Sequence, residues 1–168
     1  MAAESIDRTL IAGVGYRNLR DLSVGNAVID ALLEMEWPPG VEVEDLSYGP
    51  MDAIFRFKEA SFERLIVVGA VARAGRIPGE VYRSRWRYET EAPELVQSRV
   101  AEAVTGVISL DNLLVICAHF EVLPRDTVVI EVEPENADWG ETFSPRVARA
   151  SERIVAQISA TWGASLVE

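Results

Sequence analysis

Cysteines, long apolar runs and targeting signals are scarce or missing in this 168-residue chain. A single cysteine, Cys117, cannot form a disulfide within the chain. No apolar run approaches the ~18 residues of a membrane-spanning helix. The first residues have neither the basic region nor the apolar region of a secretory signal. We therefore expect a cytoplasmic protein with no membrane partner.

Basic residues are also in deficit. The chain has 16 Lys and Arg against 27 Asp and Glu, a net charge of −11 with its one histidine neutral. This charge repels a phosphate backbone, so we expect no nucleic-acid partner. Hydrophobic residues make up 49% of the chain, enough for a core without disulfides. The length and the lack of repeats or linkers predict a single domain over residues 1–168.

Strand and helix patterns alternate along the chain. Runs of β-branched residues predict buried strands, and apolar residues at three- and four-residue steps predict amphipathic helices. This alternation predicts a three-layer α/β/α sandwich with a mostly parallel central sheet. The strand at 65–71 is expected at its centre, and those at 41–46 and 80–88 at its edges. The predicted strands are 9–14, 41–46, 65–71, 80–88 and 127–132; the predicted helices are 24–35, 51–58, 95–104, 110–120 and 147–162.

Arginines gather between the third and fourth of these strands and in the fourth itself. The alternation in 80–88 puts Arg83, Arg85 and Arg87 on one face and Trp86 on the other. An edge strand of this kind can pair with an extended peptide and hold its carboxylates, which makes these four residues candidates for substrate binding. Charges on an edge strand also prevent unwanted sheet pairing, and both interpretations stay open.

The glycine-rich turn Gly13-Val14-Gly15 lies between the first strand and the first helix. A turn of this kind can bind phosphate at the helix N-terminus. However, it lacks the lysine of a P-loop and the third glycine of a dinucleotide-binding turn, so we expect no nucleotide and no other cofactor.

Several short motifs, in their order and spacing, resemble the maturation endopeptidases of nickel-iron hydrogenases over nearly the whole chain. Each is common by itself, and the shared order carries the resemblance. The resemblance implies an α/β fold. It also implies the activity of the family, which removes a C-terminal peptide from the hydrogenase large subunit after nickel insertion. The motifs are Gly13-Val14-Gly15 with Asp21 and Gly25, Val43-Glu44-Asp45 with Gly49 and Met51, Leu65-Ile66-Val67-Val68, Pro78-Gly79-Glu80-Val81, Ser109-Leu110-Asp111-Asn112, Leu123-Pro124, Glu133-Pro134-Glu135 and Phe143-Ser144.

The chain departs from this resemblance at the three positions through which the family recognises nickel. The resemblance implies an acidic residue after Asp21, an aspartate ending the central strand and a histidine before a later helix. The corresponding residues are Leu22, Gly69 and Gly106, with Val107 as the alternative to Gly106. Nickel requires nitrogen, oxygen or sulfur donors, and none of these side chains supplies one. We therefore expect no metal site.

Other residues could in principle replace the missing site. Asp21 is a weak catalytic candidate because it follows a strand that ends where α/β folds bind ligands, but an aspartate near a helix start is usually a cap. His119 and Cys117 lie two apart on a predicted helix, point to different sides, and are interpreted as structural.

Three hypotheses about function follow. The first is a degenerate member of the family that binds a hydrogenase large subunit or a related protein without cutting it. The second is an active C-terminal-processing endopeptidase whose metal is held by the substrate, so whether the chain is an enzyme stays open. The third is an unrelated α/β domain that binds a small molecule in a crevice beside Gly15 and Gly69. Occlusion of that crevice by Leu22, Tyr16 and Tyr48 would count against the third. The oligomeric state is not predicted.

Overall fold

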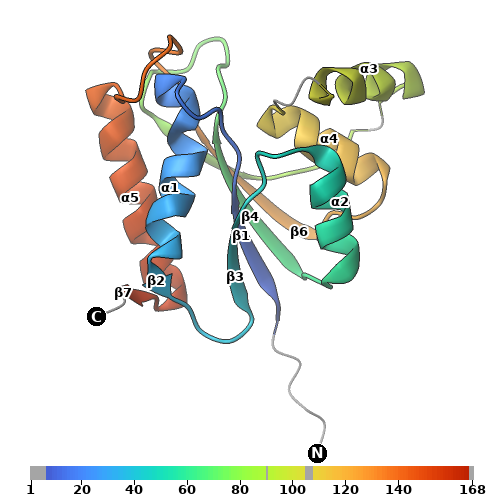
Figure 1. Cartoon of the computed structure of the whole chain (residues 1–168), viewed down its shortest axis with the longest axis horizontal. Helices are drawn as coiled ribbons and strands as arrows, with labels where there is room; N and C mark the ends of the chain where they lie inside the picture. Colours follow the sequence, from blue (N-terminus) through green and yellow to red (C-terminus); the bar gives the residue numbers. More distant parts are fainter. Residues whose placement is uncertain (1–6, 90, 105–107, 167–168) are drawn as a thin grey trace, which may run out of the picture.

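A computed structural model of the chain describes residues 7–89, 91–104 and 108–166 (Figure 1). Its centre is a five-stranded sheet in the order β3-β1-β4-β6-β5. All neighbours are parallel except β5, which is antiparallel to β6. The predicted mostly parallel sheet is therefore confirmed, with β4 at its centre and β3 and β5 at its edges. The strands are β1 (Thr9–Gly13), β3 (Val41–Asp45), β4 (Arg64–Ala70), β5 (Val81–Arg85) and β6 (Asp126–Val132).

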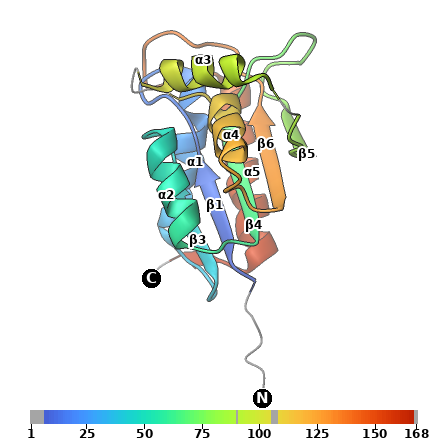
Figure 2. The same cartoon turned by 90° about the vertical axis from the view of Figure 1, so that its right-hand side faces the viewer.

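Helices cover both faces of the sheet, which confirms the three-layer sandwich. Figures 1 and 2 show α1 (Val24–Leu33) and α5 (Pro145–Trp162) on one face. The other face is covered by α2 (Pro50–Glu59) and α4 (Leu110–His119), and α3 (Pro93–Ala103) packs against α4. Within the described part of the chain, no helix is both long and apolar enough to cross a membrane.

The sheet separates two apolar clusters. Alternate residues of β1 and β4 point to opposite faces, so Leu65 and Val67 pack with α2 and α4 while Ile66 and Val68 pack with α1 and α5. The central positions of β1 and β4, which are buried on both faces, are therefore all apolar. Each fully buried side chain of this size contributes about 1.5–3 kcal/mol to folding.

Local sequence signals set the helix ends. Proline occupies the first turn of α2, α3 and α5, where its missing N–H has no helical partner to lose. The side chain of Ser109 accepts a hydrogen bond from Asn112 N and begins α4. Gly163 ends α5 at a φ of 66°, a left-handed conformation that suits glycine.

Three details differ from the prediction. The first helix ends at Leu33 and not at Met35, because Met35 and Glu36 form β2, which pairs with β7 (Ser165–Leu166). A short 3-10 helix, η1 (Arg20–Ser23), precedes α1. The last edge strand ends at Arg85 instead of reaching Tyr88. Two-residue strands and single turns carry too little periodicity to be recognised in a sequence.

Candidate functional site

The glycine turn after β1 allows the chain to pass very close to α1. A Cβ atom on Gly13 would lie 2.3 Å from Gly25 O, and one on Gly25 would lie 2.2 Å from Val14 O. The amides of the turn are used within the chain, since Val14 N donates to Val68 O and Gly15 N donates to Ser47 Oγ. These amides are therefore not free to hold a phosphate, and the turn has a packing role.

Asp21 lies on η1, after this turn, and is completely buried. Its carboxylate accepts four hydrogen bonds: from Glu135 N at 2.9 Å, and from Asn136 N, Ser144 N and Ser144 Oγ at 2.8 Å each. Asp21 therefore does not cap the helix that follows it, and that prediction is wrong. It ties the segment before α1 to the loop before α5, and we call this contact the Asp21 junction.

The donors of the Asp21 junction determine the ionisation of its carboxyl group. Burial by itself would raise the pKa of Asp21, but the hydrogen bonds from Ser144, Asn136 and Glu135 outweigh burial and lower the pKa below its ordinary value of 3.8. Asp21 is therefore ionised at neutral pH. All four bonds join it to residues more than 110 positions away, so only the fold could identify its partners.

The three positions implied for nickel recognition do not form a metal site. Backbone and side-chain atoms pack closely around Gly69. A Cβ atom there would lie 2.9 Å from Val14 O and 3.1 Å from Leu110 Cδ2. Leu22 uses its backbone oxygen to accept a bond from Tyr16 N. Gly106 and Val107 lie outside the described residues. No group of three or more His, Cys, Asp or Glu side chains within the described ranges could hold a metal ion.

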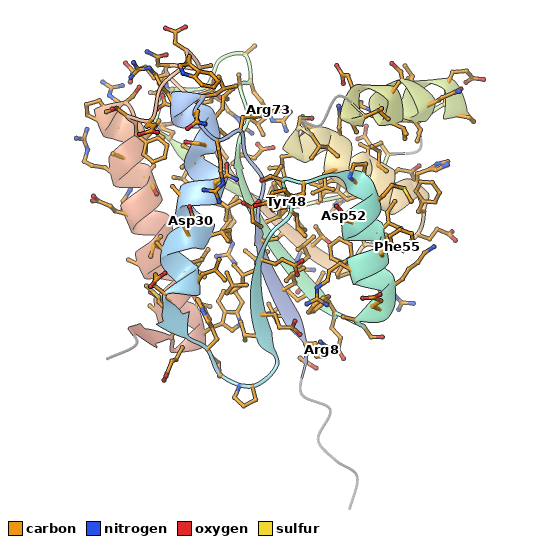
Figure 3. The ribbon with its side chains drawn as sticks, in the orientation of Figure 1. Arg8, Asp30, Tyr48, Asp52, Phe55 and Arg73 are labelled. Atoms are coloured by element: carbon orange, nitrogen blue, oxygen red, sulfur yellow. The ribbon has the colours of Figure 1, made fainter. Side chains whose placement is uncertain are left out.

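An ionic network occupies the neighbouring end of the sheet. Glu131 on β6 is buried and accepts hydrogen bonds from Arg73 Nε at 3.1 Å and from Arg76 Nη1 at 2.5 Å. Arg73 Nη2 also donates to Asp111 Oδ1 of α4 at 2.8 Å. Burial would raise the pKa of Glu131, but the two guanidinium groups lower it overall. Arg73, which Figure 3 labels near the end of β4, thus links the sheet to the helix α4. It does not belong to the edge strand β5 that carries the other arginines.

A crevice of about 340 Å³ opens beside Gly15. Tyr48 and Trp139, exposed by 72% and 76%, stand at its rim. On its floor, Asn26 Nδ2 donates to Asp45 Oδ2 and to Ser47 Oγ, while the buried Asn26 Oδ1 has no hydrogen-bond partner among the described residues. Neither Gly69 nor Leu22 lines it, so the crevice predicted beside Gly15 and Gly69 forms only beside Gly15. Its lining is Gly15, Tyr16, Arg17, Leu19, Asn26, Asp45, Ser47, Tyr48 and Trp139.

The four predicted substrate-binding residues do not share one surface. Arg83 and Arg85 line a groove of about 420 Å³ together with Trp162 of α5. Trp86 lies on the opposite side, packed against the cluster of α2 and α4 and stacked on Tyr88 with ring centroids 6.0 Å apart. Arg87, which is exposed, follows the end of β5.

Sequence reasoning missed three arginines on α5 that lie on the same side of the sheet. Arg146, Arg149 and Arg153 line a second groove, of about 530 Å³, with the segment at 77–80. Two acidic residues, Glu80 and Glu152, also line it, so the arginines are in the majority. Their spacing of three and four residues was the available signal, because residues at this spacing share one face of a helix.

Cys117 and His119 do not form a site. Cys117 is fully buried, and burial raises the pKa of its thiol to about 12. The thiol is therefore unreactive at neutral pH. His119, the exposed last residue of α4, packs edge-on against Phe120 with ring centroids 5.5 Å apart. The predicted structural roles fit this arrangement.

No protein-family model matches the chain, and no curated protein sequence matches it. Solved structures do match. The hydrogenase maturating endopeptidase HybD from E. coli is 22% identical over 92% of this chain and 91% of that chain, with a TM-score of 0.68. The hydrogenase 2 maturation peptidase from Thaumarchaeota archaeon SCGC_AB-539-E09 is 26% identical over 93% and 98%, with a TM-score of 0.62. The nickel-iron hydrogenase maturation protease HycI from Thermococcus kodakarensis is 17% identical over 95% of both chains, with a TM-score of 0.64. The predicted resemblance is confirmed.

Proposed function

Since this chain resembles the hydrogenase maturation endopeptidases over more than nine tenths of its length, we propose that it binds a nickel-iron hydrogenase large subunit, or a related protein, without cutting it. The fold supplies the scaffold, and the site residues decide the chemistry. In this proposal the chain keeps the partner-binding surface and has lost both nickel recognition and peptidase activity.

The observation that carries this proposal is the closed position at Gly69. A carboxylate there would need space that Val14 O and Leu110 Cδ2 already occupy. The missing donor is therefore matched by packing that leaves no room for one. Leu22 adds no donor either, so nickel carried by a substrate would meet apolar atoms and glycine in place of ligands.

The second candidate function is an endopeptidase whose metal is held by the substrate, with Asp21 assisting. The geometry disfavours it, because all four hydrogen bonds of the Asp21 carboxylate run to the loop before α5. A general base must reach the proton that it abstracts, and this buried carboxylate faces its own loop. The third candidate, an unrelated α/β domain, is inconsistent with the structural matches.

One experiment separates binding from cleavage. The purified protein is incubated with nickel-loaded large-subunit precursor from the same organism, and the mixture is analysed by size-exclusion chromatography and intact mass. We expect a complex whose large subunit keeps its full mass. Loss of a C-terminal peptide from the large subunit would contradict the noncatalytic assignment, and absence of a complex would contradict the partner.

A gain-of-function variant provides the matched control. The triple substitution Leu22→Glu, Gly69→Asp and Gly106→His puts a potential donor at each position where the resemblance implies one. Because the space at Gly69 is already filled, we expect neither protein to trim the precursor. Trimming by the triple variant alone would show that the missing donors, and not the filled space, account for the missing activity. Trimming by both would show that the donors are dispensable.

A further inference from the structure

The edge strand β5 presents unpaired backbone groups to solvent. Within the described residues β5 pairs only with β6, where Trp86 N donates to Thr127 O and Glu133 N donates to Glu80 O. Backbone pairing alternates along an antiparallel strand, so the residues between these two pairs direct every second N–H and C=O away from β6. The outward backbone groups therefore belong to Val81, Arg83 and Arg85.

The side chains of these three residues point toward the layer of α1 and α5. Val81 packs against that apolar cluster, and Arg83 and Arg85 line the groove with Trp162. Figure 2 shows β5 at the margin of the sheet. The same residues thus offer open backbone groups at the edge and guanidinium groups beside α5.

Five arginines on this side of the molecule have few partners inside the chain. No ion pair joins Arg83, Arg146, Arg149 or Arg153 to another described residue. The guanidinium of Arg85 lies 3.4 Å from Asp126, and its side chain is 75% exposed. We call β5 together with Arg146, Arg149 and Arg153 the arginine edge.

The opposite edge of the sheet shows that unpaired charge is not general in this protein. On β3, Glu42 pairs with Arg8 and Arg56, and Glu44 pairs with Arg56. Asp45 accepts from Arg17 at 3.0 Å. The charges of that edge are therefore balanced within the chain, whereas those of the arginine edge are not.

Protection of the edge against unwanted pairing does not explain the whole arrangement. Arg83 and Arg85 on the strand itself would be enough to discourage sheet pairing. The arginines of α5 do not lie on the edge strand, and gathering like charges on one side costs electrostatic repulsion. In a chain with a net charge of −11, a basic surface of this kind is complementary to a negatively charged partner.

We propose that the arginine edge is a docking site for an extended acidic segment of a partner protein. The segment adds to the sheet beside β5 and bonds to the outward backbone groups of Val81, Arg83 and Arg85. Because side chains of a strand alternate, acidic residues at every second position of the segment face the guanidinium groups of β5 and α5. This inference rests on the proposed function, because it takes the partner to be a protein. It adds the surface of this chain to which that partner binds.

Hydrogen exchange of the purified protein with a defined peptide tests the docking mode. The probe is acetyl-Glu-Val-Glu-Val-Glu-Val-Glu-amide, and the readout is the exchange rate of single backbone amides by NMR. We expect the amides of Val81, Arg83 and Arg85 to exchange at least tenfold more slowly with the peptide than without it. The same peptide with Lys in place of Glu is expected to have no effect. Unchanged exchange at these amides would overturn strand addition.

Charge reversal tests the arginines. We expect Arg83→Glu and Arg149→Glu each to weaken peptide binding at least tenfold, and Arg125→Glu, a matched exposed arginine with no ion pair among the described residues, to leave it unchanged. Equal effects of all three would reduce the site to overall charge and overturn the proposal. Equal protection of the β5 amides by inorganic phosphate would also overturn the proposal. Protection of these amides that rises with protein concentration in the absence of peptide would overturn it as well, because it would indicate pairing between two copies of this chain.

The large-subunit precursor separates this proposal from the proposed function. If the precursor binds the parent and the Arg83→Glu and Arg149→Glu variants equally well, the proposed function is supported and the arginine edge is rejected as the docking site. If the peptide protects the amides of β5 but the precursor forms no complex, the docking site is supported and the hydrogenase large subunit is rejected as the partner.

Discussion

The Asp21 junction and the arginine edge are opposite solutions to the placement of charge. At the junction, one buried carboxylate receives four hydrogen bonds from its own chain. At the arginine edge, exposed guanidinium groups donate almost no hydrogen bonds to the described residues, and the one ion pair there joins Arg85 to Asp126 at 3.4 Å. A charge whose partners are internal stabilises the fold, and a charge without them remains available to another molecule. Substitutions should therefore change stability at the first region and binding at the second.

The largest expected effect is at the junction. Asp21→Ala removes all four bonds and leaves three backbone amides without an acceptor, so we expect the free energy of unfolding to fall by about 2–4 kcal/mol. Urea denaturation measures the loss. Asp138→Ala, in the same loop but exposed, is the control and should cost less than about 0.5 kcal/mol. Equal losses in both variants would remove the distinction between the two regions.

The closed position at Gly69 comes next. Gly69→Ala places a Cβ 2.9 Å from Val14 O, and we expect a loss of about 1–3 kcal/mol from overpacking. Gly69→Asp should lose at least as much, because it also buries a charge. Thermal denaturation measures both, and calorimetric titration of Gly69→Asp with nickel should detect no binding. Tight nickel binding by that single variant would show that the position is open after all.

Acid should weaken the junction before it affects the arginine edge. The pKa of Asp21 is lower in the folded chain than its ordinary 3.8, so its contribution is present above pH 4 and is lost as the pH falls through the folded-state value. The isosteric variant Asp21→Asn cannot titrate. We expect the difference in unfolding free energy between parent and variant to narrow steadily below about pH 4. If the difference in unfolding free energy stays constant down to pH 2, the stabilisation comes from the shape of the Asp21 side chain and not from its charge.

The smallest effects compare the two edges of the sheet. Arg56→Ala breaks contacts with Glu42 and Glu44 on β3, and we expect a loss of about 0.5–1 kcal/mol that shrinks with added salt. Arg83→Ala on β5 breaks no ion pair with a described residue and should change stability by less than about 0.5 kcal/mol. Paired urea denaturation at low and high salt measures both. A loss at Arg83 that equals the loss at Arg56 would mean that the arginine edge is already satisfied within the chain.

Local patterns were sufficient for the layers and the order of the elements. The unbroken apolar run at 65–71 indicated a strand buried on both faces, and β4 lies at the centre of the sheet. The alternation of Val and Glu at 41–46 and of Arg with aromatic residues at 80–88 indicated edges, where β3 and β5 lie. Both patterns depend only on residues one or two positions apart, so the sequence displays them directly.

The candidate sites depended more on long-range contacts. The sequence separated Arg83 and Arg85 from Trp86 by the faces of a strand, but it could not bring Arg149 beside that strand. It grouped the arginines between the third and fourth predicted strands with those of the edge strand, although in the fold one of them, Arg73, bonds to Glu131 and Asp111. Helix and strand faces are local properties, whereas the neighbour of each face is chosen by packing.

By itself, the sequence determined the α/β architecture, the acidic balance and the absence of donor side chains at the positions implied for nickel. Only the tertiary structure decided that Asp21 is a buried tether instead of a cap, that Leu110 and Val14 close the space at Gly69, and that α5 completes the arginine edge. The physical reason is distance along the chain. Periodicity fixes how a segment folds, but hydrogen bonds and packing between segments that are far apart in the sequence form only when the whole sheet brings them together.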